Sequence, residues 1–155
     1  MIIEKFTKND LSLLELVAKI FDQYRMFYGR NSDLLAAKNF LQERVVNEES
    51  QIFLAKDGEK IIGFMQLYFG FSSVRMEKVC ILNDLYVDQD YRKRGVARAL
   101  IQRAKEFCLE NKLMKITLTT AKTNEGAQKL YESEGYEVEE EFLVYNLELG
   151  LMKKK

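Results

Sequence analysis

Apolar side chains recur every three or four positions early in the chain, between residues 11 and 24 and again between residues 34 and 45. This spacing matches the 3.6-residue period of an amphipathic α-helix. Gly29 interrupts the pattern, and Ser32 or Asp33 can cap the helix that follows. The pattern therefore predicts two consecutive helices, each with one apolar face.

Three other segments lack this helical periodicity. They are rich in Ile, Phe, Leu and Tyr, as is typical of strands, and comprise residues 2–6, 51–56 and 60–71. Asp57-Gly58 separates the last two, and this dipeptide tolerates the positive φ of a type I′ hairpin turn. The near-continuous apolar run at 79–87 predicts a central strand that is covered on both faces.

Helices and strands alternate in the remaining sequence. We expect helices over 95–110 and 124–134, a strand over 115–120 between them, and a closing pair of strands at 136–138 and 142–149. The resulting order, β-α-α-β-β-β-α-β-α-β-β, implies a mixed sheet with helices on its faces. The fold class is therefore an α/β or α+β layered domain.

Composition narrows the possible functions. The chain has 155 residues, 47% apolar and 31% charged, without a linker or repeat, which predicts one globular domain over residues 1–155. Lys plus Arg and Asp plus Glu both number 24, so no basic excess favours nucleic-acid binding. Because His is absent, triads that use His and metal sites that contain His are excluded, and we expect no metal.

Cys80 and Cys108 are the two cysteines, and both lie in apolar stretches. We expect them to be small buried side chains in a reducing compartment, not metal ligands or a disulfide. The sequence shows no signal peptide and no apolar run long enough to span a membrane. These features predict a cytoplasmic protein that does not bind membranes.

Residues 82–107 contain the most informative segment, because a buried strand ends near Val87 and a basic loop then opens a helix. A helix N-terminus presents unpaired N–H groups and a partial positive charge, so it can bind a phosphate group. Gly95 lets the backbone approach an anion closely, and Arg92, Lys93 and Arg94 add positive charge. The segment therefore predicts a pyrophosphate-binding site.

Two motifs resemble those of the GNAT superfamily of N-acetyltransferases. The first is Arg92-x-x-Gly95-x-Ala97, which is similar to the family's pyrophosphate-binding signature. The second, residues 124–136, is similar to the family's Asn-x-x-Ala-x-x-Leu-Tyr-x-x-x-Gly-Phe/Tyr segment. The resemblance is strongest over residues 60–136 and implies a mostly antiparallel sheet of six to seven strands with helices on both faces. The run after Gln66 resembles the polyamine-type and histone-type branch of the superfamily.

The resemblance implies direct transfer of an acetyl group from acetyl-CoA to a primary amine. Tyr131 would protonate the leaving thiolate as general acid, and a backbone N–H near Leu85 would stabilise the oxyanion. Asn124 would contact the cofactor arm. The full set of residues expected to bind the cofactor is Leu85, Val87, Arg92, Lys93, Arg94, Gly95, Val96, Ala97, Arg98 and Asn124.

The general base is less clearly indicated. The resembling branch often has a carboxylate at the position of Asn83, whose amide cannot accept a proton. Asp84 is the nearest carboxylate, and burial in its apolar strand would raise its pKa. Asp84 can act as the base, contact the ammonium group of the acceptor, or have a structural role such as capping a bulge. If it is not the base, water would relay the proton.

The resemblance implies that the acceptor would be a small-molecule amine or a lysine-like side chain, with Asn83 and Tyr28 as candidate substrate contacts. The alternative function is a non-catalytic module that binds acyl-CoA as a sensor. A nucleic-acid-binding role for the basic patch at 92–98 is disfavoured by the neutral net charge. Dimerisation of two copies through the terminal strands is compatible with the fold.

Overall fold

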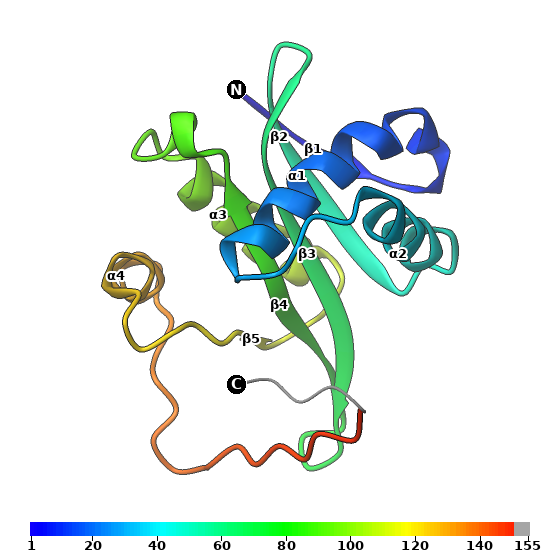
Figure 1. Ribbon diagram of the computed structural model, residues 1–155. Helices are drawn as coiled ribbons and strands as arrows, with labels where there is room; N and C mark the ends of the chain where they lie inside the picture. Colours follow the sequence, from blue (N-terminus) through cyan, green and yellow to red (C-terminus); the bar gives the residue numbers. More distant parts are fainter. Residues whose placement is uncertain (151–155) are drawn as a thin grey trace. The chain divides into compact units, whose positions relative to one another are not determined.

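Five strands form one sheet in the order β1-β2-β3-β4-β5 (Figure 1). Neighbouring strands are antiparallel except β4 and β5, which are parallel. This computed structural model describes residues 1–150, and the chain divides into two compact units, one of residues 1–121 and one that begins at Lys122. The strands are β1 (Ile2–Phe6), β2 (Ser50–Asp57), β3 (Lys60–Ser72), β4 (Glu77–Val87) and β5 (Ile116–Thr117).

Helices α1 (Leu14–Phe27) and α2 (Leu34–Val46) cover one face of this sheet, and the short 3-10 helix η1 (Lys8–Leu13) precedes them. Their apolar faces meet side chains of the sheet in a buried cluster, in which the ring of Phe21 lies 5.9 Å from that of Phe64 on β3. Burial of such apolar surface is the main force that holds helices onto a sheet. The two helices that periodicity predicted are thus confirmed.

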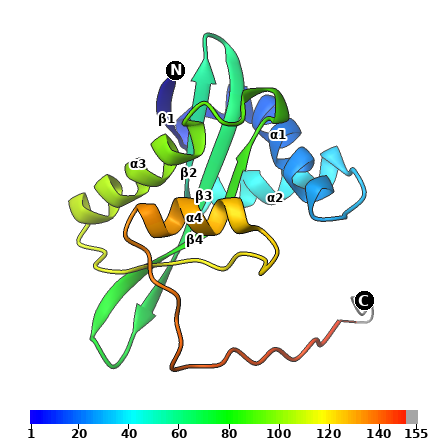
Figure 2. The same ribbon diagram turned by 90° about the vertical axis from the view of Figure 1, so that its left-hand side faces the viewer.

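Helix α3 (Val96–Glu110) covers the opposite face, as Figure 2 shows, and follows the 3-10 helix η2 (Gln89–Tyr91). Phe107 of α3 packs against Phe53 of β2 at 5.6 Å between ring centroids. Cys80 and Cys108 are both buried and unbridged, as the sequence predicted. Their mutual hydrogen bond, together with burial, raises the pKa of the Cys80 thiol.

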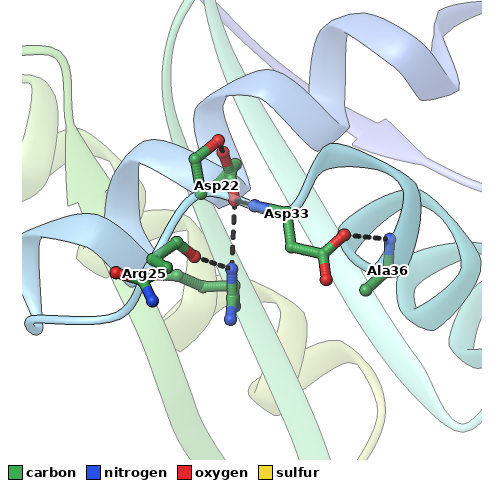
Figure 3. Close-up of polar contacts among 6 residues, drawn as sticks. Asp22, Arg25, Asp33 and Ala36 are labelled. Atoms are coloured by element: carbon green, nitrogen blue, oxygen red, sulfur yellow. Dashed lines mark hydrogen bonds and ion pairs between the residues drawn. The ribbon is translucent and has the colours of Figure 1, made fainter.

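A buried carboxylate fixes the connection between α1 and α2 (Figure 3). Asp22 of α1 is 3% exposed and accepts hydrogen bonds from Arg25 and from the N–H of Asp33, each at 3.0 Å, and from the Ser32 hydroxyl. Burial alone would raise the pKa of Asp22, but these three donors lower it. Asp33 caps α2 through the N–H of Ala36. Of the two residues that the sequence offered as the cap of α2, Asp33 therefore has this role, and Ser32 instead donates to Asp22.

The β2–β3 hairpin is confirmed, but its turn differs from the predicted one. Asp57 pairs with Lys60, so the two loop residues are Gly58 and Glu59. Gly58 has φ +62°, while Glu59 is not among the residues with positive φ. Positive φ at the first loop position alone is the arrangement of a type II′ turn, not the expected type I′.

Two expected strands, 136–138 and 142–149, are absent from the second unit, so the described sheet has five strands and not six or seven. The N–H of Tyr136 instead donates to the carbonyl of Tyr131 at the end of helix α4 (Glu125–Ser133). The Glu139 carboxylate accepts from the N–H groups of Glu141 and Phe142. These local hydrogen bonds replace those of a strand ladder at the start of the segment.

Strand β5 is also shorter than predicted. The sequence suggested a strand over 115–120, whereas pairing with β4 covers only Ile116 and Thr117, opposite Cys80 and Ile81. The two strands are therefore hydrogen-bonded over a short distance only. The structure describes the fold through residue 150, so the last five residues of the predicted 1–155 domain lie outside the described part.

Candidate active site

A β-bulge in β4 determines which side chains reach each face of the sheet. Gln66 pairs with Asp84 and Leu67 pairs with Leu82, which leaves Asn83 as an extra residue. Successive side chains in a regular strand alternate between faces, so one extra residue reverses the alternation. Cys80 accordingly contacts α3, whereas Tyr86, an even number of residues further on, contacts Tyr24 of α1.

The bulge places the Asp84 carboxylate on the α1 side of the sheet, where it is 3% exposed. Gln66 Nε2 donates to Asp84 Oδ2 at 2.6 Å, and Asn83 Nδ2 donates to Asp84 Oδ1 at 2.9 Å. The Tyr24 hydroxyl donates to the Asn83 carbonyl oxygen at 3.2 Å and also interacts with the Asp84 carboxylate. Two amide donors and a phenol, all neutral, therefore surround a buried acid.

Burial raises the pKa of Asp84, while hydrogen bonds from Gln66, Asn83 and Tyr24 act in the opposite direction. The carboxylate affects its neighbours in turn. Burial and the charge of Asp84 raise the pKa of Tyr68 to about 12, and the same two causes raise the pKa of Tyr24. Both phenols therefore remain protonated at neutral pH and can serve as hydrogen-bond donors. A buried acid with a raised pKa is a common property of catalytic groups.

Backbone groups at the end of β4 point away from β3, and one of them, the Val87 carbonyl, accepts from Arg92 Nε. The N–H of Asp88 donates to Ile62 on the β3 side, and backbone groups alternate in direction along a strand. Those of Leu85 and Val87 therefore point away from β3. Within residues 1–150, β5 is the only strand on that side, and its pairing ends at Ile81. The two residues predicted to bind the cofactor arm thus present their backbone at an unpaired strand edge.

The basic loop after β4 has an unusual backbone. Lys93 and Gly95 have φ values of +63° and +82°, and α3 begins at Val96 directly afterwards. A Cβ atom at Gly95 would meet no atom within 4 Å, so the glycine is required for its positive φ rather than for space in this structure. The first N–H groups of α3 are available to a ligand, as in any helix N-terminus.

The side chain of Arg92 turns back toward the strand. Its Nε donates to the Val87 carbonyl at 3.0 Å, and its guanidinium group lies 5.4 Å from the ring of Phe27 and 5.3 Å from that of Tyr86. These contacts tie the loop to β4 and to the end of α1. The other cations predicted here, Lys93, Arg94 and Arg98, are exposed.

Tyr28 reaches the buried acid through Tyr24. Its ring is 57% exposed and packs edge-on against the ring of Tyr24, 5.1 Å away. Tyr24 in turn hydrogen-bonds to Asp84. Of the two candidate substrate contacts, Asn83 therefore binds the carboxylate directly and Tyr28 is linked to it through Tyr24, and both residues are exposed.

The second unit carries Asn124 and Tyr131 on or beside α4. Asn124 is the N-cap of this helix, and its side chain accepts from the N–H of Ala127 at 3.2 Å. Tyr131 is half-buried, and its ring lies 5.7 Å from that of Tyr136. The sequence prediction that Tyr131 shares a partly buried helix face with Ala127 and Leu130 agrees with this arrangement.

Sequence reasoning missed Gln66, Ser50, Tyr24 and Tyr68 as members of this site. A polar Gln66 within an apolar strand was the available signal, because a fully buried amide needs hydrogen-bond partners. The bulge could not be read from sequence, and it is the bulge that places Asp84 beside Gln66. Among the described residues, no group of three or more His, Cys, Asp or Glu side chains could hold a metal ion. No helix in residues 1–150 is long and apolar enough to cross a membrane.

Comparisons with known proteins agree with this fold. The family model for the acetyltransferase (GNAT) family matches residues 14–136. The uncharacterized N-acetyltransferase YhfO of Bacillus subtilis is 43% identical over 131 residues, which cover 84% of this chain and 88% of that protein. A probable acetyltransferase of Haemophilus influenzae is 30% identical over 150 residues, covering 94% and 99%.

A crystal structure of a probable acetyltransferase aligns with a TM-score of 0.89 and 39% sequence identity, covering 97% of this chain and 99% of that one. The fold and the site therefore define an enzyme that transfers an acyl group to an amine. The chain belongs to the acetyltransferase (GNAT) family.

Proposed function

We propose that this enzyme uses acetyl-CoA to acetylate a primary amine of a small molecule or a lysine-like side chain. The observation that carries the proposal is the arrangement of β4. This strand has a buried acid at Asp84, and no other strand of the described chain pairs with its outer edge at Leu85 and Val87. The same strand leads directly to the N-terminus of α3. One continuous stretch of chain thus offers groups suited to both substrates.

The residues of the first unit fit acetyl-CoA in chemical type. Outward backbone groups at Leu85 and Val87 suit the amide-containing pantetheine arm, which can pair with them as an added strand does. The N–H groups of Val96, Ala97 and Arg98 and the charges of Lys93 and Arg94 suit its pyrophosphate. Arg92 holds the Val87 end of the loop and adds to the positive charge. Asn124 would contact the cofactor arm from the second unit, as the family resemblance implies.

In the proposed reaction, the amine nitrogen bonds to the thioester carbonyl carbon and the bond from that carbon to sulfur breaks. The Leu85 N–H would donate to the carbonyl oxygen as charge develops there. Asp84 would accept the proton that the amine loses, for which its raised pKa suits it. Asn83 has no basic group and would contact the acceptor. Tyr131 would give its hydroxyl proton to the leaving thiolate.

The nature of the acceptor follows from the same groups. A buried carboxylate next to tyrosine rings suits a cationic amine, since ammonium groups are attracted both to anions and to ring faces. Tyr28 is the exposed ring of this group and would contact the acceptor. A cytoplasmic location and a homodimer remain predictions from the sequence.

The test measures release of the CoA thiol from acetyl-CoA across a panel of polyamines, aminoglycosides, amino acids and lysine peptides. We expect turnover with at least one class. Tyr131→Phe should lower kcat at least about tenfold with acetyl-CoA affinity nearly unchanged, because only a proton donor is removed. Tyr145→Phe is the matched control, since Tyr145 is 87% exposed in the same unit.

Each outcome has a distinct meaning. Unchanged turnover in Tyr131→Phe would remove the acid role of this residue. Full activity of Asp84→Asn at neutral pH would exclude Asp84 as the base. Binding of acetyl-CoA without turnover of any amine would favour the sensor function, and failure to bind acetyl-CoA by calorimetry would overturn the proposal.

A further inference from the structure

The buried acid is part of a longer chain of hydrogen bonds that crosses three strands. Ser50 Oγ of β2 donates to Gln66 Oε1 of β3 at 2.7 Å, and Gln66 Nε2 donates to Asp84 Oδ2 of β4 at 2.6 Å. Gln66 is fully buried, and both ends of its amide are occupied by side chains. A buried polar side chain in a sheet core requires such partners and adds little stability compared with an apolar residue of the same size. The mechanism described above leaves Gln66 and Ser50 without a role.

Building on the proposed function, we infer that Gln66 is a positioning residue for the transfer reaction: its amide, oriented by Ser50, holds the Asp84 carboxylate ionised and in a fixed rotation. The orientation of the amide follows from chemistry. An ionised carboxylate can only accept hydrogen bonds, so the amide nitrogen must face Asp84. The amide oxygen then faces Ser50, which donates to it.

The protonation state of Asp84 is coupled to this orientation. A protonated Asp84 can donate to the amide oxygen, which would require the amide of Gln66 to turn over and its nitrogen to face the Ser50 oxygen. By donating to the Gln66 amide oxygen, the Ser50 hydroxyl therefore favours the ionised form of Asp84. The carboxylate has roughly four lone-pair sites, of which the amide N–H groups of Gln66 and Asn83 occupy two, and the Tyr24 hydroxyl, which donates to the Asn83 carbonyl, lies beside them. A site is therefore left for the proton of the amine.

Other titratable groups around Asp84 are few and do not supply this control. Tyr24 of α1 and Tyr68 of β3 are the phenols that interact with it, and both stay protonated at neutral pH. Arg44 of α2 and Glu49 interact with Tyr68 rather than with Asp84. Tyr28 interacts with Tyr24. The hydrogen bond from Gln66 to the carboxylate, at 2.6 Å, is shorter than that from Asn83, at 2.9 Å, so the removal of Gln66 should have the largest effect on the proton affinity of Asp84.

The experiment follows the Asp84 carboxyl carbon by NMR titration of the full chain labelled at aspartate carboxyl carbons, with the signal assigned by its loss in Asp84→Asn. In Gln66→Met, an apolar side chain of similar length, the proton affinity of Asp84 should rise about tenfold. In Ser50→Ala it should rise less, by about threefold, and Ser50→Thr should restore it because the hydroxyl is retained. The acid limb of the profile of kcat/KM against pH should move by the same factors.

Met65→Leu is the matched control, because Met65 is also fully buried and adjacent in the strand but alternates to the α3 face. The control should leave both the NMR titration and the pH profile unchanged. If the Asp84 signal titrates in Gln66→Met as in the wild type, or if Met65→Leu moves it equally, the inference is wrong. Ser50→Ala tests the same coupling in case Gln66→Met does not fold.

The positioning role of Gln66 and the proposed acetyl transfer can be disproved by different results. If the NMR titration moves but the kinetic limb does not, Gln66 holds Asp84 without serving the reaction, and the inference fails while acetyl transfer stands. If the wild-type protein transfers no acetyl group, the proposed function fails first, and the positioning role fails with it.

Discussion

Asp22 and Asp84 are both 3% exposed, yet folding changes their proton affinities in opposite directions. At Asp22, a guanidinium group, a backbone N–H and a hydroxyl together outweigh the effect of burial and lower the pKa. At Asp84, burial outweighs three neutral donors and raises it. The difference has two causes. Asp22 has a cation beside it whereas the hydrogen-bond donors of Asp84 are neutral, and Asp84 lies deeper in the protein, so that burial weighs more on its charge.

The Asp22 carboxylate therefore has a structural role, whereas the Asp84 carboxylate is suited to a role in the reaction. Asp22 fixes the α1–α2 connection, and its hydrogen bonds from Arg25 and Asp33 stabilise its ionised form. Asp84 occupies a buried position of the strand where an apolar residue would be more stable, because burial of its charge is unfavourable for folding. An acid kept in that state is available to exchange a proton or to bind a cation, which are two of the three roles left open by the sequence.

The largest expected effect on stability is at the first site. Asp22→Asn should lower the free energy of unfolding at neutral pH by about 2–3 kcal/mol, because hydrogen bonds to a charged group are lost and Arg25 loses its partner. Folding lowers the pKa of Asp22, so its contribution is present above the unfolded pKa and is lost as the pH falls through the folded pKa. Urea unfolding at neutral and acidic pH measures both.

The difference between wild type and Asp22→Asn should therefore shrink in acid. Asp57→Asn is the control, since Asp57 is exposed at the β2–β3 turn. A difference that is constant with pH would show that the ionised form of Asp22 is not what stabilises the loop.

A smaller effect is expected at the cap beside this site. Asp33→Ala should cost about 1 kcal/mol, because it removes the hydrogen bond from the N–H of Ala36 but leaves the backbone N–H that binds Asp22. Asp33→Asn keeps a capping oxygen and should lose less. Thermal unfolding of the two variants compares them, and an equal loss would show that the charge of Asp33 matters more than its cap.

The smallest effect, with the opposite sign, is expected at Asp84. Asp84→Asn should change the free energy of unfolding by no more than about 1 kcal/mol, toward greater stability at neutral pH, because a buried charge is removed. Folding raises the pKa of Asp84, so the ionised acid destabilises the protein above the folded pKa. This penalty is relieved as the pH falls through the folded pKa toward the unfolded pKa.

The advantage of Asp84→Asn should accordingly vanish in acid, when the wild-type carboxyl is protonated. Urea unfolding over the same pH range gives this difference. A loss of stability as large as that of Asp22→Asn would mean that Asp84 is a structural residue, and the contrast between the two acids would no longer hold.

Periodicity predicted the fold where helices and strands are long. The apolar faces of α1 and α3 follow the 3.6-residue pattern, and β4 reads as a buried run. The prediction was wrong for 142–149, whose apolar residues look like a strand but form no ladder within the described chain. Alternation in sequence indicates a strand only if a partner edge pairs with it, and that partner is a property of the whole fold.

The candidate site was predictable in part. The buried acid at Asp84 and the glycine at the start of α3 could be found from sequence, because each breaks a local pattern. The position of the Arg92 guanidinium beside Phe27 depends on a neighbour far along the chain and could not be found in this way, whereas the N-cap role of Asn124 is local. Gln66 was visible as a polar residue in an apolar strand, but its partner depends on the register of β3 and β4.

The extra residue at Asn83 means that the two parts of β4 tolerate a change of length at this point. Deleting Asn83 would make Leu82 and Asp84 consecutive, and regular alternation would then still place them on opposite faces, with Asp84 opposite Gln66. The deletion would remove the Asn83 amide that donates to the acid, but it would not turn the acid away from Tyr24. Redesign of this enzyme for other amines can therefore shorten the strand at this one position, whereas a deletion elsewhere in β4 would reverse the faces of the residues beyond it.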